Sequence, residues 1–286
     1  MAEIDHAGQT AGVVLVYRPP ADVVENVERL LDQVPWVFVV NNSPGEAHDV
    51  LAHLTANPRV TLLDQEGNVG VAAGFNAGMR AALEDGFDFV WIFDQDSTIT
   101  DRMHEKLQDA RRNAVVEVGI VGPALRAAET GRVYDNERGV GTAPREVLIS
   151  SGALFSRPVL ERIGFHDEAL FIDYVDHDIS LRASRAGFTN LKVFDALLDH
   201  RFGASEPTPF LGRKVYLSNY SPMRLYYSAR NRVIVLRRFG GGPWFREDIA
   251  FTLRALTKML LAERGRPQKI AAFFRGCRDG VRYRGV

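Results

Sequence analysis

The sequence FDFVWIFDQDS, residues 87–97, places two carboxylates directly after an apolar run. The run from Phe87 to Phe93 has the length and composition of a strand that is covered on both faces of a sheet. Asp94 and Asp96 follow it one residue apart, so their oxygen atoms can bind one hard divalent cation. An isolated D-x-D triplet is more often a solvated acidic turn. Its position at the end of an apolar strand favours the metal site instead.

Apolar strands and helices alternate along the chain before this run. We expect strands at 13–16, 36–40 and 60–63 and helices at 21–31, 48–54 and 71–83. This order predicts an α/β fold with a mostly parallel sheet and helices on both faces. Ligands of such sheets bind at the carboxyl ends of the strands. The Asn41-Asn42 turn, the segment 64–68 and the acidic triplet should therefore share one neighbourhood.

The pattern after the acidic triplet is less regular. We expect a helix at 103–112, short strands at 120–121 and 147–149, and a helix at 174–186. The last part of the chain predicts helices at 222–239, at 245–262 and from Pro267 onward, since Ser221-Pro222 is a typical helix start. The predicted organisation is a catalytic domain at 1–212 and a helical C-terminal extension at 213–286.

The bulk composition is that of an ordinary globular protein, with 46% hydrophobic and 25% charged residues. A single cysteine, Cys277, excludes a disulfide within the chain and suits a reducing cytoplasm. The first ten residues lack a basic-then-apolar signal pattern, and no apolar run approaches the length of about 20 residues that crosses a bilayer. We therefore expect a cytoplasmic location.

The net charge of −1 hides a strong asymmetry between the two ends of the chain. Residues 211–286 hold 17 Lys and Arg against 4 Asp and Glu, a net charge of +13, and the preceding residues carry −14. Basic helices with one apolar face are typical of helices that lie on anionic membranes. The alternative is a helical cap with a solvated basic face. No nucleic-acid motif accompanies the charge, so a nucleic-acid partner is not expected.

Two further segments carry polar groups suited to a ligand. Residues 68–78, NVGVAAGFNAG, open a helix with glycines, and a helix N-terminus favours an anion such as pyrophosphate. We expect Asn68 and Gly70 near the ligand and Gly78 in helix packing. Residues 171–178, FIDYVDHD, concentrate three carboxylates and a histidine at a helix start, which suggests a pocket with a general base. Acids at a helix N-terminus are also ordinary dipole partners, and Asp178 can pair with Arg182 four residues later.

These motifs together resemble the inverting family 2 glycosyltransferases of the GT-A fold, and among them most resemble bacterial rhamnosyltransferases. The resemblance covers roughly residues 11–240. It rests on motifs in the expected order, namely Tyr17, Asn41-Asn42-Ser43, Asn68-x-Gly70, the DQDS of residues 94–97, Ser151-Gly152-Ala153, the FIDYVDHDISLR of residues 171–182, His200, and Arg224-Leu225-Tyr226-Tyr227-x-x-Arg230-Asn231.

The resemblance implies a role for each matching residue. Asp94, Asp96 and His200 would bind Mg²⁺ or Mn²⁺, although a lone histidine is more often a plain polar residue, and Asp176 would be the catalytic base that deprotonates the acceptor. The implied donor-binding residues are Tyr17, Asn41, Asn42, Asn68, Gly70, Asn76, Asp94 and Gln95. The implied residues on the acceptor or diphosphate side are Ser151, Gly152, Asp173, Asp178, Tyr227 and Arg230. Val175 and Asn41 stand where the family commonly has acids.

The function that the resemblance implies is transfer of rhamnose from dTDP-rhamnose to a cell-surface glycan or a polyprenyl-diphosphate-linked acceptor. The enzyme would act as a peripheral protein on the cytoplasmic face of the inner membrane. A UDP-hexose donor on the same fold is one alternative, and a non-catalytic nucleotide-sugar or membrane-binding module is another. The oligomeric state stays open.

Overall fold

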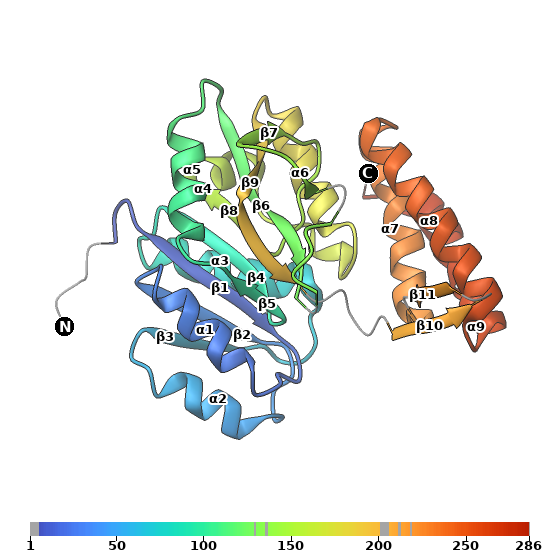
Figure 1. The fold of residues 1–286 in the computed structure, drawn as a ribbon, viewed down its shortest axis with the longest axis horizontal. Coiled ribbons are helices and arrows are strands. Elements are labelled where there is room, and N and C mark those ends of the chain that lie inside the picture. The colour runs from blue at the N-terminus through green and yellow to red at the C-terminus, as the bar shows by residue number, and fades with distance from the viewer. Residues whose placement is uncertain are drawn as a thin grey trace. The chain divides into compact units, whose positions relative to one another are not determined.

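The computed structural model describes residues 6–128, 130–134, 137–200, 206–210, 213–217 and 219–285. Its contacts divide the chain into two compact units (Figure 1). The α/β unit contains the residues up to Phe171 and those from Val175 to His200. The helical unit contains Ile172–Tyr174 and the described residues from Glu206 onward. Residues 211 and 212, at the boundary expected between 1–212 and 213–286, lie outside the described residues, so that boundary stays a prediction.

The first half of the α/β unit is a parallel sheet, as the alternating pattern predicts. Its strands are β1 (Thr10–Val16), β2 (Trp36–Asn41), β3 (Val60–Asp64) and β4 (Phe89–Asp94), and the helices between them are α1 (Val23–Leu31), α2 (His48–Thr55) and α3 (Gly70–Glu84). The strands lie side by side in the order β3-β2-β1-β4, and all three pairings are parallel. The ends of β1, β2 and β4 therefore meet at one edge of the sheet.

The second half of the unit extends this sheet with β8, β6, β9 and β5 in that order, and β7 pairs with β9. These elements are β5 (Ser97–Ile99), α4 (Met103–Arg112), β6 (Val118–Ala127), β7 (Thr142–Pro144), β8 (Ala153–Ser156), α5 (Arg157–Ile163), the 3₁₀ helix η2 (Glu168–Leu170), α6 (Val175–Arg185) and β9 (Thr189–His200). The strand expected at 147–149 is wrong. Leu148 lies in a buried loop, where its N–H donates to the Ser180 hydroxyl on α6 at 3.2 Å.

Alternate side chains of each central strand point to opposite faces of the sheet, and each face has its own apolar core. Val14 and Val16 pack with α1, α2 and α4 on one face. Val13 and Leu15 pack with α3, α5 and α6 on the other. The sheet is therefore the middle layer of three, which explains why the run at 89–93 is apolar throughout.

The helical unit consists of α7 (Pro222–Phe239), α8 (Pro243–Ala262) and α9 (Arg266–Arg282), with the hairpin β10 (Glu206–Phe210) and β11 (Arg213–Leu217). Ser221 caps α7 by accepting the Arg224 N–H at 3.2 Å. Helices α7 and α9 approach closely at Gly276 and Gly280, where an added Cβ would lie 2.3 and 2.5 Å from backbone oxygens of α7. None of the described helices is both long enough and apolar enough to cross a membrane.

Candidate functional site

Three metal-ligating side chains meet at the carboxyl edge of the sheet. Asp94 ends β4, Asp96 follows it, and His200 ends β9. One ligand atom from each lies within 4.8 Å of the others, and all three residues are half-buried. The pairing of β5 with β9 brings them together, because it sets Ser97 opposite His200. Two carboxylates and an imidazole are a donor set that fits a divalent cation, so the cluster agrees with the expected metal site.

A chain of hydrogen bonds through two buried serines connects Asp94 to His200. The Asp94 N–H donates to Ser151 Oγ at 3.1 Å, and Ser151 Oγ donates to Ser97 Oγ at 2.7 Å. Ser97 Oγ lies 2.9 Å from His200 Nδ1. Both serines are buried, so they orient the histidine ring and the acidic turn rather than face solvent. Ser151, expected on the acceptor or diphosphate side, has this supporting contact in the structure.

Gln95, between the two aspartates, holds the end of β1. Its side-chain oxygen accepts the Tyr17 N–H at 2.8 Å, and its side-chain nitrogen donates to the Tyr17 carbonyl at 3.1 Å. Tyr17, beside this clamp, is 42% exposed. The clamp leaves Tyr17 with an exposed aromatic surface at the edge where Asp94 and Asp96 lie.

The Asn41-Asn42 turn, at the end of β2, is buried. Asn41 donates to Asp64 Oδ1 at 2.7 Å, and its side-chain oxygen accepts the Ser43 N–H at 3.0 Å. Asn42 donates to the Gly70 carbonyl at 3.0 Å, and its buried side-chain oxygen has no hydrogen-bond partner among the described residues. The polar group beside this turn that is open to a ligand is therefore the exposed Asp64 carboxylate held by Asn41.

The start of α3 differs from the expected anion site. The Phe171 carbonyl accepts the Val71 N–H at 2.6 Å and the Ala72 N–H at 3.3 Å, so another part of the chain uses these two amides. Gly70 has φ +87°, and an added Cβ would lie 2.5 Å from the Phe171 ring. A side chain at position 70 would clash with Phe171, so the close packing there requires glycine. Asn68 has an exposed side chain whose oxygen accepts the Gly70 N–H at 3.0 Å.

Two other residues expected to bind ligand have supporting contacts in the structure. Asn76 is buried, and its amide donates to the His166 carbonyl and accepts the His166 N–H, each at 2.9 Å. Gly152 has φ +80°, donates its N–H to the Ile92 carbonyl at 2.8 Å and accepts the Trp91 indole N–H at 2.9 Å. Gly78 packs against Val13 as expected, because an added Cβ would lie 2.4 Å from its methyl group.

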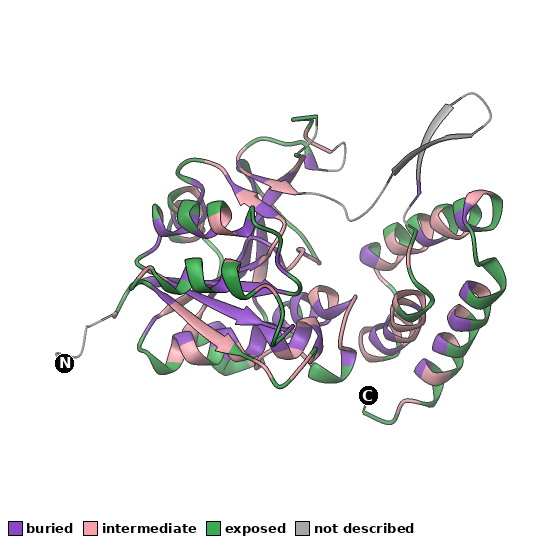
Figure 2. Ribbon diagram, turned by 90° about the horizontal axis from the view of Figure 1, so that it is seen from below, coloured by how far each residue is buried: buried purple, intermediate pink, exposed green. Residues whose placement is uncertain are grey.

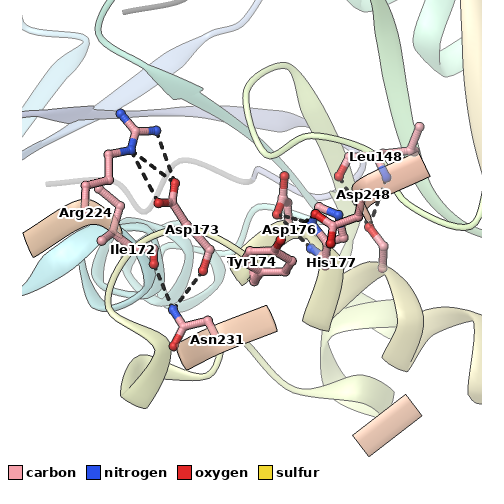
Figure 3. Close-up of polar contacts among 10 residues, drawn as sticks. Leu148, Ile172, Asp173, Tyr174, Asp176, His177, Arg224, Asn231 and Asp248 are labelled. Atoms are coloured by element: carbon pink, nitrogen blue, oxygen red, sulfur yellow. Dashed lines mark hydrogen bonds and ion pairs between the residues drawn. The ribbon is translucent and has the colours of Figure 1, made fainter. Parts of the chain in front are cut away.

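The two carboxylates in the first turn of α6 have different environments, and Figure 3 shows one of them, Asp176, beside His177. Asp176 is 22% exposed, and its Oδ1 lies 2.8 Å from both His177 Nδ1 and the His177 N–H. Burial raises the pKa of Asp176, but the charge and hydrogen bonds of His177 outweigh burial and hold this pKa below its ordinary value. Asp178 is 1% exposed and pairs with Arg182 at 2.8 Å. Asp178 thus makes the helix ion pair that its spacing allowed, and Asp176 is the more accessible carboxylate.

Comparison with known proteins identifies the family. Residues 13–164, more than half of the chain, match the glycosyl transferase family 2 model. The chain belongs to glycosyl transferase family 2. It is a glycosyltransferase, and its α/β unit has the GT-A fold that the motifs predict.

Relatives of this glycosyltransferase match along most of its length. It is 28% identical over 288 residues to the dTDP-rhamnosyl transferase RfbF of Shigella flexneri, a match that covers 94% of each chain. It is 28% identical over 249 residues to the galactofuranosyltransferase GlfT1 of Mycobacterium tuberculosis, which covers 80% of this chain and 82% of the relative.

Solved structures share the fold at low sequence identity. The crystal structure of S. aureus TarS 1-349 matches with a TM-score of 0.61 and 14% identity, over 94% of this chain and 81% of TarS. The structure of GalNAc-T7 with UDP, GalNAc and Mn²⁺ matches with a TM-score of 0.60 and 10% identity, over 80% of this chain and 47% of GalNAc-T7.

The remaining candidate residues of this glycosyltransferase belong to the helical unit. The Asp173 carboxylate accepts the Arg224 guanidinium at 3.1 Å. Arg230 lies over the Tyr227 ring, 5.1 Å from its centre, and donates to the Asn231 side-chain oxygen at 3.0 Å. Sequence analysis did not assign a role to Ser97 or to Asn231. The sequence marks these two residues only by their position, since Ser97 follows the acidic triplet and Asn231 follows Arg230.

Proposed function

We propose that this family 2 glycosyltransferase inverts the anomeric centre while it transfers rhamnose from dTDP-rhamnose, with Mg²⁺ or Mn²⁺ as cofactor. One observation carries the proposal: the α/β unit contains both the Asp94–Asp96–His200 cluster and Asp176, a carboxylate whose side chain is 22% exposed. A diphosphate leaving group would need a cation bound at the cluster to offset its negative charge. An acceptor hydroxyl would need Asp176 as the base that takes its proton. The choice of rhamnose is supported by the similarity to RfbF, which extends over 94% of both chains.

The donor would bind at the carboxyl edge of the sheet. The exposed Tyr17 suits stacking with a planar base, and the exposed Asp64 and Asn68 offer hydrogen-bonding groups. Asn41 would act through Asp64, because it holds that carboxylate at 2.7 Å. A divalent cation at Asp94, Asp96 and His200 would offset the negative charge that develops on the diphosphate as the bond to the sugar breaks.

Asp176 would be the general base. Its carboxylate is ionised at neutral pH, as an ordinary carboxylate is, and its side chain is 22% exposed, so it can accept the proton of an acceptor hydroxyl. The hydroxyl oxygen then attacks the anomeric carbon from the side opposite the nucleotide, which gives inversion. Asp178 cannot replace it, because that carboxylate is buried against Arg182.

The Asp176→Asn variant tests this proposal. The amide keeps the size of the side chain but cannot take a proton, so transfer should fall by about 10²- to 10⁴-fold while the affinity for dTDP-rhamnose stays unchanged. Transfer is measured by release of dTDP, and donor affinity by calorimetry. The exposed Asp195→Asn on β9 is the matched control. Transfer at the wild-type rate in the Asp176→Asn variant would remove Asp176 as the base.

A second donor has support of its own. The similarity to GlfT1 covers 80% of the chain, so a UDP-linked hexose donor is the alternative on the same fold. Thermal-shift measurements with dTDP- and UDP-sugars, each with Mn²⁺ or Mg²⁺, separate the two. A larger shift with dTDP-rhamnose supports the first proposal, and a larger shift with a UDP-sugar supports the second.

The helical unit would place the enzyme on an anionic membrane. Exposed apolar side chains on α8 and α9 are Phe251, Leu253, Leu260, Leu261, Phe274 and Val281. Exposed basic residues among them are Arg254, Lys258, Arg275, Arg278 and Arg282. Interleaved apolar and basic side chains suit the boundary between headgroups and acyl chains. We therefore propose a peripheral enzyme on the cytoplasmic face of the inner membrane, acting on a cell-surface glycan or polyprenyl-diphosphate-linked acceptor.

A further inference from the structure

The chain adopts an unfavourable backbone conformation just before Asp176. Phe171, Asp173 and Tyr174 have φ of +64°, +62° and +64°, in the left-handed region that residues with a Cβ rarely adopt. Such a conformation persists only where surrounding contacts hold it, and it is concentrated at functional sites. The contacts of the segment Ile172–Tyr174 therefore show what keeps it in place.

Helix α7 holds the backbone of this segment. Asn231 donates its side-chain N–H groups to the Ile172 carbonyl at 2.8 Å and to the Asp173 carbonyl at 3.0 Å (Figure 3). Asn231 is fully buried, and Arg224, in the first turn of α7, binds the Asp173 carboxylate at 3.1 Å. Two side chains of one helix thus hold both the backbone and a side chain of the segment.

Helix α8 holds the next residue. The Tyr174 hydroxyl donates to Asp248 Oδ1 at 2.5 Å, and Arg232 donates to the other oxygen of Asp248 at 2.8 Å. The Arg232 guanidinium also lies over the Tyr174 ring, 5.2 Å from its centre. Burial raises the pKa of Tyr174, so its hydroxyl keeps the proton that it donates. This arrangement is a buried, charge-assisted network, in which each group depends on the others.

The segment leads directly into the proposed base. The chain enters the helical unit at Ile172 and returns to the α/β unit at Val175, one residue before Asp176. We propose that Asn231, Asp248 and Tyr174 are positioning residues, which fix the backbone that leads into Asp176 and so couple the helical unit to acceptor deprotonation. This inference rests on the proposed role of Asp176. These residues act on the base through the chain.

The test compares two tyrosine variants of the full-length enzyme. Tyr174→Phe removes the hydroxyl that binds Asp248. The matched control, Tyr226→Phe, removes a hydroxyl that binds Asp279 on α9 at 3.1 Å and leaves the segment Ile172–Tyr174 intact. We expect kcat for transfer to fall by about 10- to 100-fold in Tyr174→Phe, because small displacements of a catalytic group have effects of this size. The dissociation constant of dTDP-rhamnose should not change.

Hydrogen exchange of a peptide that spans residues 170–178 gives a readout independent of chemistry. Exchange should accelerate in Tyr174→Phe and stay at the wild-type rate in Tyr226→Phe. Unchanged kcat, or reduced kcat with unchanged exchange, would overturn the positioning role. The failure of the proposed function looks different, because the wild-type enzyme itself would then transfer no sugar from dTDP-rhamnose.

Discussion

The two units of this glycosyltransferase solve different problems. The largest side chains that are fully buried in the described chain lie between Phe38 and Phe155, so all of them belong to the α/β unit. The helical unit instead exposes Phe251 and Phe274, and residues 211–286 carry a net charge of +13. Figure 2 shows the contrast as buried residues concentrated on the strands and exposed residues along the C-terminal helices. The α/β unit buries its large apolar residues in a core, whereas the helical unit exposes some of its own to solvent.

Histidines sharpen this comparison. All seven lie in the first 200 residues, and residues 211–286 contain none. His166 is buried between the rings of Phe75 and Phe155, and neither of its ring nitrogens has a hydrogen-bond partner in the described chain. Burial is the main cause that lowers its pKa to about 3. The α/β unit therefore contains a buried histidine that lowers its stability in acid, and residues 211–286 contain no histidine.

The largest expected effect is on the core. Phe75→Ala should lower the free energy of unfolding of the α/β unit by about 3–5 kcal/mol, because Phe75 is fully buried and the deletion leaves a cavity. Phe274→Ala, at a side chain that is 66% exposed, should change stability by less than about 0.5 kcal/mol. Chemical denaturation followed by circular dichroism measures both. Equal losses would refute the contrast between a packed unit and an exposed one.

The second prediction concerns acid. Neutral His166 is favoured in the fold, so its effect is absent above the unfolded-state pKa of about 6.5, and stability falls as pH drops from there toward 3. The slope is about 1.4 kcal/mol per pH unit, or about 2–3 kcal/mol between pH 6.5 and 4.5. His166→Leu should remove the part of the pH-dependent loss of stability that His166 causes. The exposed His48→Leu serves as the control and should keep the wild-type slope.

The third prediction places metal-dependent donor binding in the α/β unit. Asp96→Ala removes one of the three clustered ligands, so the affinity for dTDP-rhamnose with Mn²⁺ should fall by at least about tenfold, or ~1.4 kcal/mol. Asp195→Ala should bind as the wild type does. Calorimetry with Mn²⁺ and with a chelator is the measurement. A donor affinity that neither the variant nor the chelator changes would contradict the metal site.

The smallest effect is expected on the membrane. Arg254→Gln removes one exposed charge of α8 and should weaken binding to anionic vesicles by about 1 kcal/mol, or about fivefold. Arg102→Gln removes a charge that is 74% exposed on the α/β unit and should leave vesicle binding unchanged. Sedimentation with phosphatidylglycerol vesicles at low salt compares them. Equal binding of Arg254→Gln and the wild type would favour the helical cap over the membrane surface.

The short strand β5 (Ser97–Ile99) was not expected, but the strands and helices before it could be predicted because their signals are local. Each strand there is an apolar run, and each connecting helix has a repeating apolar face, so the parallel order follows from short-range patterns. The strand β9 gives a weaker signal, since Lys192, Asp195 and Asp199 interrupt it. The strand expected at 147–149 fails for the opposite reason, because its apolar residues belong to a loop beside α6, in which Leu148 is buried.

The candidate site divides in the same way. Asp94 and Asp96 could be named from a local signal, since they end an apolar strand, and Asp176 could be named from the family resemblance of residues 171–182. The contacts of Gly70 with Phe171 and of Asn76 with His166 could not be predicted. These partners lie about 100 and 90 residues further along the chain. Asn231 was not assigned a role, because its partners lie 59 and 58 residues before it.

The sequence alone determined that FDFVWIFDQDS ends a buried strand with two carboxylates, since hydrophobic period and chain order are local properties. Only the tertiary structure decided which groups join those carboxylates. The β5–β9 pairing brings His200 to Asp96 over more than one hundred residues, and α7 and α8 hold the segment before Asp176. Such contacts depend on how distant elements pack, and side-chain hydrogen bonds of that range have no repeating pattern in the sequence.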